Sequence, residues 1–356
     1  MGDPPVESVV TNVVAGEEPA VESGWRMPAE WAPHERTVIA WPQREAAWRG
    51  TTIEAARDSH AEVVAAVSQF EPVLLVADPS QEDDARSRVP AENVELLPLP
   101  IDDSWMRDSG PIIVTAPGGG RVGVDFRFNA WGESFSPYDN DAAVAAGILE
   151  HLGIERRESR LVLEGGSIAV DGNGLLVTTE QCLLDPTRNP ELDREAIGAG
   201  VGAALGAERV IWLGQGLVED ADTDGHVDNI CAFVEPGRAL LQTVPDPGDP
   251  NWAGVEDNRS RLQEAGVEVV ELELLPRTER DSGEPVVVPY MNFYVANGAL
   301  IVPVGGMDPD MDEEALGRLA GLFPGREVVG IDGRVLALGG GGIHCITQQI
   351  PAGRAR

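Results

Sequence analysis

The chain has 356 residues, 42% of them hydrophobic, which is enough to bury a sizeable core. It carries 60 Asp and Glu residues against 26 basic residues, all of them arginine, for a net charge of −34. Such a surface repels nucleic acids and anionic membranes and attracts cations, and the lack of lysine excludes Schiff-base chemistry and a lysine-dependent phosphate loop. We therefore expect a small cationic partner, with no nucleic acid and no membrane.

The first 23 residues differ in composition from the rest of the chain. Residues 1–23 are rich in Glu, Pro and Val without a clear period, and we interpret them as a flexible acidic tail ahead of one domain, residues 24–356. They lack the pattern of a signal peptide, and no apolar run reaches the roughly 18 residues of a membrane span. Three cysteines, an odd number, argue against a disulfide framework. These features predict a cytoplasmic protein.

A pattern of a polar residue, an apolar strand, a glycine-containing turn and a second apolar strand recurs along the chain. The copies follow Asp108, Glu164, the pair His226 and Asp228, and Asn292. Their turns are expected at residues 117–120, 171–174, 236–237 and 297–298. Successive turns lie about 55 to 65 residues apart, which is typical of repeat architectures.

Helical patterns separate these hairpins and are rich in Ala, Leu, Glu and Arg. They cover residues 53–70, 141–152, 191–205, 259–265 and 311–322. About five units of strands plus one helix fit into the residues after the tail. The spacing predicts an α/β fold, a closed ring of small modules rather than a parallel Rossmann sheet. Four of the polar residues, Asp108, Glu164, His226 and Asp228, stand before the first strand of their hairpins, and we expect these four to meet at one end of the ring.

Cys345, in the segment GGGGIHCITQQIP, is the candidate nucleophile. Four preceding glycines permit close backbone approach and positive φ, which a cysteine that only fills the core does not need. Cys182 and Cys231 are instead expected to pack in the core. A metal site at His344 and Cys345 is not expected, because neighbours on a strand point to opposite faces; His344 is expected to have a structural or supporting role.

Three segments supply the candidate partners of Cys345. Two of them are acidic and one is rich in glycine. The segment DTDGHVDN places His226 and Asp228 on the same side of a strand, which suits a shared site. Asp108 in WMRDSG and Glu164 before two glycines are further candidate acids. An acid that only caps a turn has the same local sequence as Asp108 or Glu164, so the residues alone leave both interpretations open.

Blocks of this sequence resemble agmatine deiminases, within the wider guanidine-modifying superfamily that includes arginine and peptidyl-arginine deiminases. The resemblance covers nearly everything after the first 23 residues. Its seven ordered blocks are GWRMPAEWAPHERTVIAWP (24–42), DDSWMRDSGP (102–111), LEGGSIAVDGNG (163–174), CLLDPTRNP (182–190), DTDGHVDN (222–229), NFYVANGALIVP (292–303) and GGGGIHCITQQIP (339–351). The resemblance implies a five-bladed α/β propeller of the pentein type.

The resemblance also implies a function. Cys345 matches the nucleophile, His226 the general acid and base, and Asp108 and Asp228 the carboxylates that hold a guanidinium. Glu164 matches a further active-site acid. The implied reaction is hydrolysis of agmatine to N-carbamoylputrescine and ammonia through a covalent thiouronium on Cys345. No cofactor and no metal are expected for it.

Three residues are expected to contact the substrate. Trp105 is expected to stack on the substrate by a cation–π contact, the alternative being core burial, and Asp102 and Asp222 are among the acids expected at the site entrance. Ala169 and Gly342 stand where the family often has His and Asn, which leaves open another guanidine substrate such as peptidyl-arginine. An amidinotransferase and a non-catalytic relative stay open as well. We expect a homo-oligomer.

Overall fold

The computed structural model of the protein describes residues 10–12, 20–280 and 282–353. Most of the predicted tail, residues 1–9 and 13–19, lies outside the described residues. Within it, strand β1 (Val10–Asn12) pairs antiparallel with β10 (Arg209–Leu213), and the Val21 amide donates to the Ala203 carbonyl. The boundary between a tail and a single domain at residue 24 stays a prediction.

Five sheets among the described residues share one topology, in which an antiparallel pair of strands is followed by a strand parallel to the second member of the pair. The first four are β5 (Ile112–Thr115), β6 (Arg121–Arg127) and β7 (Glu155–Val162); β8 (Ile168–Val170), β9 (Leu175–Thr179) and β10; β11 (Cys231–Glu235), β12 (Arg238–Gln242) and β13 (Glu268–Leu272); and β16 (Tyr294–Ala296), β17 (Ala299–Val304) and β18 (Glu327–Asp332). The hairpin turns fall at the four predicted positions.

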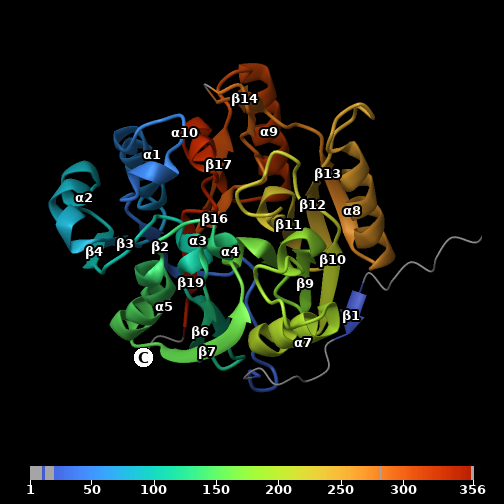
Figure 1. Ribbon diagram of the computed structural model, residues 1–356, viewed down its shortest axis with the longest axis horizontal. Coiled ribbons are helices and arrows are strands. Elements are labelled where there is room, and N and C mark those ends of the chain that lie inside the picture. Colours follow the sequence, from blue (N-terminus) through green and yellow to red (C-terminus); the bar gives the residue numbers. More distant parts are fainter. Residues whose placement is uncertain (1–9, 13–19, 281, 354–356) are drawn as a thin grey trace, which may run out of the picture.

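The fifth sheet joins the two ends of the chain. Strand β19 (Thr347–Pro351) pairs antiparallel with β2 (His34–Ala40), which β3 (Val73–Ala77) and β4 (Val94–Pro98) continue in parallel. Figure 1 labels β19 and β2 close together, left of the centre of the view. A separate hairpin consists of β14 (Arg277–Glu279) and β15 (Pro285–Val287). Because β19 directly follows the candidate nucleophile, this pairing fixes the thiol against the start of the fold.

Helices lie against the sheets (Figure 1). The longer ones are α1 (Ile53–Val67), α2 (Glu82–Arg88), α5 (Asp139–Leu152), α7 (Arg194–Leu205), α8 (Trp252–Glu264), α9 (Pro309–Leu322) and α10 (Arg334–Gly339). The short ones are α3 (Met106–Ser109), α4 (Ala130–Glu133), α6 (Glu180–Leu183), and the single turns η1 (Glu45–Ala47), η2 (Pro79–Gln81), η3 (Gly165–Ser167) and η4 (Val227–Asn229).

Local sequence explains where these helices begin. The Asp308 side chain accepts from the Met311 amide and Pro309 occupies the first turn of α9, while Asp193 caps α7 in the same way. The predicted helix at 259–265 was too short, because α8 begins at Trp252 and continues through the polar residues 256–258. The result is a mixed α/β single-domain fold. No helix within the described residues combines the length and apolarity that crossing a bilayer requires.

Candidate active site

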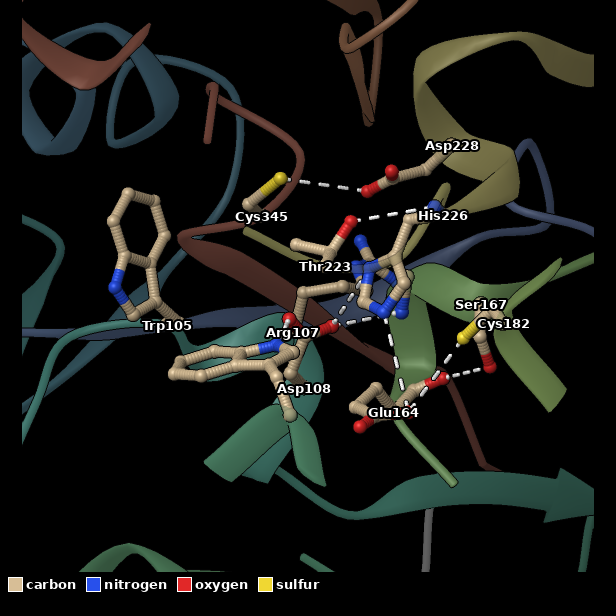
Figure 2. Close-up of polar contacts among 12 residues, drawn as sticks. Trp105, Arg107, Asp108, Glu164, Ser167, Cys182, Thr223, His226, Asp228 and Cys345 are labelled. Carbon is tan, nitrogen blue, oxygen red and sulfur yellow. Dashed lines mark hydrogen bonds and ion pairs between the residues drawn. The ribbon is translucent and has the colours of Figure 1, made fainter. Parts of the chain in front are cut away.

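Short helical turns ahead of three hairpins carry the predicted acids and the histidine. Asp108 lies in α3, just before β5; Glu164 is the N-cap of η3, before β8; His226 is the N-cap of η4, and Asp228 lies within it, before β11. Turn η3 packs against both α3 and η4. The structure therefore brings these four side chains together. Figure 2 shows Asp228 beside Cys345, and Glu164 on the far side of His226, beside Cys182.

Cys345 is buried with its sulfur among polar groups. Its Sγ lies 3.5 Å from Oδ2 of Asp228, and Asn292 Nδ2 donates to it at 3.2 Å. The amide of Arg107 donates to the Cys345 carbonyl at 3.0 Å. Burial first, and then the charges of Asp228 and Asp108, raise the pKa of the Cys345 thiol well above its ordinary value. The resting site therefore holds a neutral thiol.

The glycines before Cys345 allow the chain to pass close to two site residues. A Cβ on Gly341 would lie 2.4 Å from the Trp105 ring, and one on Gly342 would lie 2.4 Å from Oδ1 of Asn292. Gly340 has φ +104, a conformation that favours glycine. At position 342 this backbone excludes the asparagine expected from the family pattern unless Asn292 moves.

His226 is fully buried between carboxylates. Its Nδ1 lies 3.9 Å from Oδ1 of Asp108 and its Nε2 lies 4.0 Å from Oε2 of Glu164. Neither ring nitrogen has a hydrogen-bond partner among the described residues. Burial lowers the pKa of His226, but the carboxylates of Asp108, Asp228 and Glu164 outweigh it, so this pKa is raised. Because no hydrogen bond holds either ring nitrogen, His226 can exchange a proton with a neighbouring group.

Asp108 and Asp228 differ in their partners. Asp108 accepts from Trp131 Nε1 at 2.9 Å and from the Gly166 amide at 2.9 Å, and burial with neighbouring negative charge raises its pKa. Asp228 accepts from His344 Nδ1 at 2.9 Å through Oδ2, while its buried Oδ1 has no partner among the described residues. Burial raises the pKa of Asp228, but the hydrogen bond and charge of His344 outweigh it, so the pKa is lowered.

Glu164 is held by a buried arginine. Arg188 Nε donates to Oε1 of Glu164 at 3.0 Å, and both side chains are fully buried. The sulfur of Cys182 lies 4.0 Å from Oε2 of Glu164. Glu164, Cys182 and His226 each offer an atom that could ligate a metal ion, all within 4.8 Å of one another. The charge of Arg188 opposes a cation at this position.

A pocket opens in front of Cys345. It is lined by Trp105, Asp108, Trp131, Phe135, Asp222, Thr223, Gly339, Gly340 and Cys345. Trp105 is buried and stacks on Trp48 with ring centroids 5.6 Å apart, so it is both a core residue and a pocket wall. Asp222 forms ion pairs with Arg49 and Arg280. Asp222 and Asp108 are the acids of this lining.

Asp102 does not line this pocket. Its carboxylate accepts from the Asn140 amide at 2.9 Å and from Asn140 Nδ2 at 3.0 Å, at the start of α5. Ala169 does not line this pocket either. It lines a second pocket, together with Cys231, Asp228 and His344. The difference from the family pattern at Ala169 therefore does not alter the pocket in front of Cys345.

Four supporting residues were missed by sequence reasoning. Trp131 and Arg188 bind the carboxylates of Asp108 and Glu164, Asn292 donates to the Cys345 sulfur, and Glu30 binds His344. Three of them lie in the sequence blocks quoted above, 24–42, 182–190 and 292–303, so those blocks were the available signal. Trp131 lies outside every block and has an unusual positive φ of 54°.

Comparison with known proteins gives consistent matches over most of the chain. The model of the Porphyromonas-type peptidyl-arginine deiminase family matches residues 26–351. The agmatine deiminase of Pseudomonas fluorescens (strain SBW25) is 40% identical over 366 residues, with 92% of this chain and 96% of the relative covered. The agmatine deiminase of Stutzerimonas stutzeri (strain A1501) is 41% identical over 359 residues, with 93% and 96% covered.

Solved structures give the same result. The agmatine deiminase of Enterococcus faecalis superimposes with a TM-score of 0.88 at 33% identity, covering 96% of this chain and 99% of that one. A variant of the C. jejuni agmatine deiminase with substrate bound has a TM-score of 0.84 at 28% identity, with 92% of this chain and 97% of that one covered.

Proposed function

The chain belongs to the Porphyromonas-type peptidyl-arginine deiminase family, and we propose that it hydrolyses agmatine to N-carbamoylputrescine and ammonia. The observation that carries the proposal is a buried thiol, Cys345, which shares one site with His226 and the carboxylates of Asp108, Asp228 and Glu164. The relatives named agmatine deiminase favour agmatine over peptidyl-arginine, the alternative substrate.

The same relatives support a more specific architecture. We propose that the five sheets of common topology are the blades of a five-bladed α/β propeller of the pentein type. In that arrangement the turns α3, η3 and η4 are equivalent parts of successive blades. The proposal accounts for one shared site built from residues that lie far apart in the sequence.

Guanidinium binding is assigned to the two carboxylates nearest the thiol. A guanidinium is planar and delocalised, and its N–H groups fit carboxylate oxygens. Asp228 Oδ1 is buried without a partner among the described residues, and Asp108 lies across His226 from Glu164. A guanidinium held by Asp108 and Asp228 places its carbon against the Cys345 sulfur, and its charge offsets the carboxylates that keep the thiol protonated.

The reaction then follows in two steps. The Cys345 sulfur attacks the guanidinium carbon, the thiol proton passes through His226 to the leaving nitrogen, and the C–N bond breaks to release ammonia. The remaining alkylthiouronium carries the positive charge. A water that His226 deprotonates attacks the same carbon, the C–S bond breaks, the sulfur regains a proton, and the N-alkylurea leaves. The remaining proton converts ammonia to ammonium.

The far end of the substrate is assigned to the front pocket. We propose that Trp105 stacks on the distal ammonium in a cation–π contact and that Asp222 meets the same ammonium, since both side chains line the pocket. Arg49 and Arg280, which now pair with Asp222, lie outside this lining. Asp102 is engaged by Asn140 and has no part in this proposal.

Detection of the covalent intermediate tests this mechanism. Enzyme mixed with agmatine and quenched in acid during turnover is expected to carry the amidino adduct on the Cys345 peptide, measured by mass spectrometry. The Cys345→Ser variant is the control and must show no adduct. An active enzyme that never carries an adduct on Cys345 contradicts the mechanism.

Location and assembly stay proposals. The three cysteines are unpaired in the structure, which supports a reducing compartment such as the cytoplasm. A homo-oligomer is expected, and the mass in solution measured by light scattering tests it.

A further inference from the structure

His344, the residue directly before Cys345, bridges two carboxylates. Its Nδ1 lies 2.9 Å from Oδ2 of Asp228 and its Nε2 lies 2.7 Å from Oε1 of Glu30. The histidine is 5% exposed, and the Glu30 side chain is 21% exposed. Glu30 comes from the segment before β2, so the bridge links the two ends of the chain behind the thiol.

This geometry fixes the protonation of the ring. A neutral imidazole has one N–H donor and one acceptor nitrogen, whereas an ionised carboxylate only accepts. Between two carboxylates, both ring nitrogens of His344 must donate, so the ring is an imidazolium. Both carboxylates are ionised: the charges of His344 and Arg107 outweigh burial and lower the pKa of Glu30 to about 2, and His344 lowers the pKa of Asp228.

We propose that His344 is a positioning residue, an imidazolium clamped by Glu30 that fixes the Asp228 carboxylate for guanidinium binding. The inference rests on the proposed deiminase function. His344 occupies Oδ2 of Asp228, the oxygen that lies 3.5 Å from the Cys345 sulfur, and leaves the buried Oδ1 for a substrate N–H. It also supplies a positive charge beside a carboxylate that otherwise faces the thiol unneutralised.

Charged groups surround the bridge on every side. Arg107 lies 3.6 Å from Glu30 and donates to the His344 carbonyl at 3.3 Å, and its charge lowers the pKa of His344. Burial lowers that pKa too, while Glu30 and Asp228 together outweigh both and raise it. The other titratable groups that face the bridge are His34 beside Glu30, and Cys345, His226 and Asp108 beside Asp228.

Loss of the imidazolium has a defined consequence for pH dependence. Without it, the buried Asp228 takes up a proton at higher pH than in the wild type, because nearby negative charge and burial are no longer offset. Protonated Asp228 grips the guanidinium weakly. In His344→Asn, the acid limb of the kcat/KM profile is therefore expected at higher pH. A displaced Asp228 should also lower kcat by about 10- to 100-fold, because a misplacement of about 1 Å can have an effect of that size.

Two measurements test the proposal. In ¹⁵N NMR of the histidine-labelled enzyme near pH 7, the His344 signals, assigned by their loss in His344→Asn, should show both ring nitrogens protonated. One unprotonated nitrogen overturns the proposal whether or not the enzyme turns over agmatine. In kinetics, His344→Asn should move the acid limb upward, and Glu30→Gln should do so by less. If the acid limb of the kcat/KM profile is unchanged in both variants while the wild type is active, the positioning role is overturned and the imidazolium state is not.

A matched variant separates positioning from stability. Glu71 forms another buried pair with a histidine, 3.1 Å from Nδ1 of His34, but it makes no contact with Asp228. Glu71→Gln should lose stability and keep the wild-type acid limb. If the acid limb of the Glu71→Gln enzyme moves as far as the acid limb of the Glu30→Gln enzyme, the proposal is overturned. If His344→Asn does not fold, the His344 signals are assigned instead by their shift in Glu30→Gln, because Glu30 contacts the ring, and the kinetics of Glu30→Gln and the NMR result decide. A wild type inactive on agmatine refutes the proposed function and leaves the NMR result to decide on the imidazolium.

Discussion

Gly166 is expected to reject even one methyl group. A Cβ added there would lie 2.6 Å from His226 Nδ1, 2.9 Å from Asp108 Oδ1 and 3.0 Å from Asp228 Oδ2. Ordinary contacts of a Cβ begin at 3.4 Å, so His226 must move by about 0.8 Å or the turn η3 must shift. The substitution Gly166→Ala therefore perturbs three proposed catalytic groups at once without removing any of them.

The displacement gives the expected size of the effect. A misplacement of about 1 Å can lower the rate about 10²-fold, so Gly166→Ala should lower kcat/KM for agmatine by about that factor. Overpacking should lower the free energy of unfolding by about 1–3 kcal/mol, which leaves a folded protein to assay. Ammonia release at several agmatine concentrations gives kcat and KM, and urea unfolding gives the stability.

The same substitution elsewhere is the control. Gly317 lies in α9, and a Cβ there meets no heavy atom within 4 Å. Gly317→Ala should keep kcat/KM and gain up to about 1 kcal/mol of stability, the difference in helix propensity between the two residues. A folded Gly166→Ala enzyme with kcat/KM within threefold of the wild type refutes the assignment of chemistry to this site.

Three further predictions concern the thiol, the pocket wall and the buried ion pair. Because the pKa of Cys345 is raised, its alkylation by iodoacetamide should be slow at pH 7 and become faster as the pH rises. A bound guanidinium mimic that leaves the sulfur open should also make the alkylation faster. Equal rates with and without the mimic contradict this prediction. Trp105→Ala should raise KM for agmatine about 2- to 30-fold, matching a cation–π contact of about 0.5–2 kcal/mol, and an unchanged KM removes that role. Arg188→Leu strands the buried Glu164 charge and should lower the unfolding free energy by about 3–5 kcal/mol in urea titration, whereas a loss below 1 kcal/mol counts against a strong buried pair.

Repeated local patterns made much of the fold predictable. Turn residues such as Asn297 and Gly298 between apolar runs carry their own signal, and the four predicted turns lie within the hairpins of the structure. The pairing of β19 with β2 has no such signal. It joins residues about 300 positions apart, such as Thr347 and Ile39, and depends on the whole fold having formed.

The site was predictable where chemistry requires a residue type and unpredictable where packing decides. A thiol, a histidine and acids ahead of strands can be inferred from sequence, whereas the partners of those acids are set by tertiary contacts. Trp131 reaches Asp108 from the short helix α4, 23 residues away. Asp102 and Asp222 both looked like entrance acids, and only the structure shows that Asn140 engages one while the other lines the pocket.

The most direct test of the central claim is the reaction itself. Purified enzyme is incubated separately with agmatine, free arginine and an arginine-containing peptide, and ammonia and the urea product are measured, the latter by mass. We expect rapid conversion of agmatine to N-carbamoylputrescine, little conversion of the other two, and no conversion by Cys345→Ser. Turnover that survives in Cys345→Ser, or an enzyme that leaves agmatine intact, contradicts it.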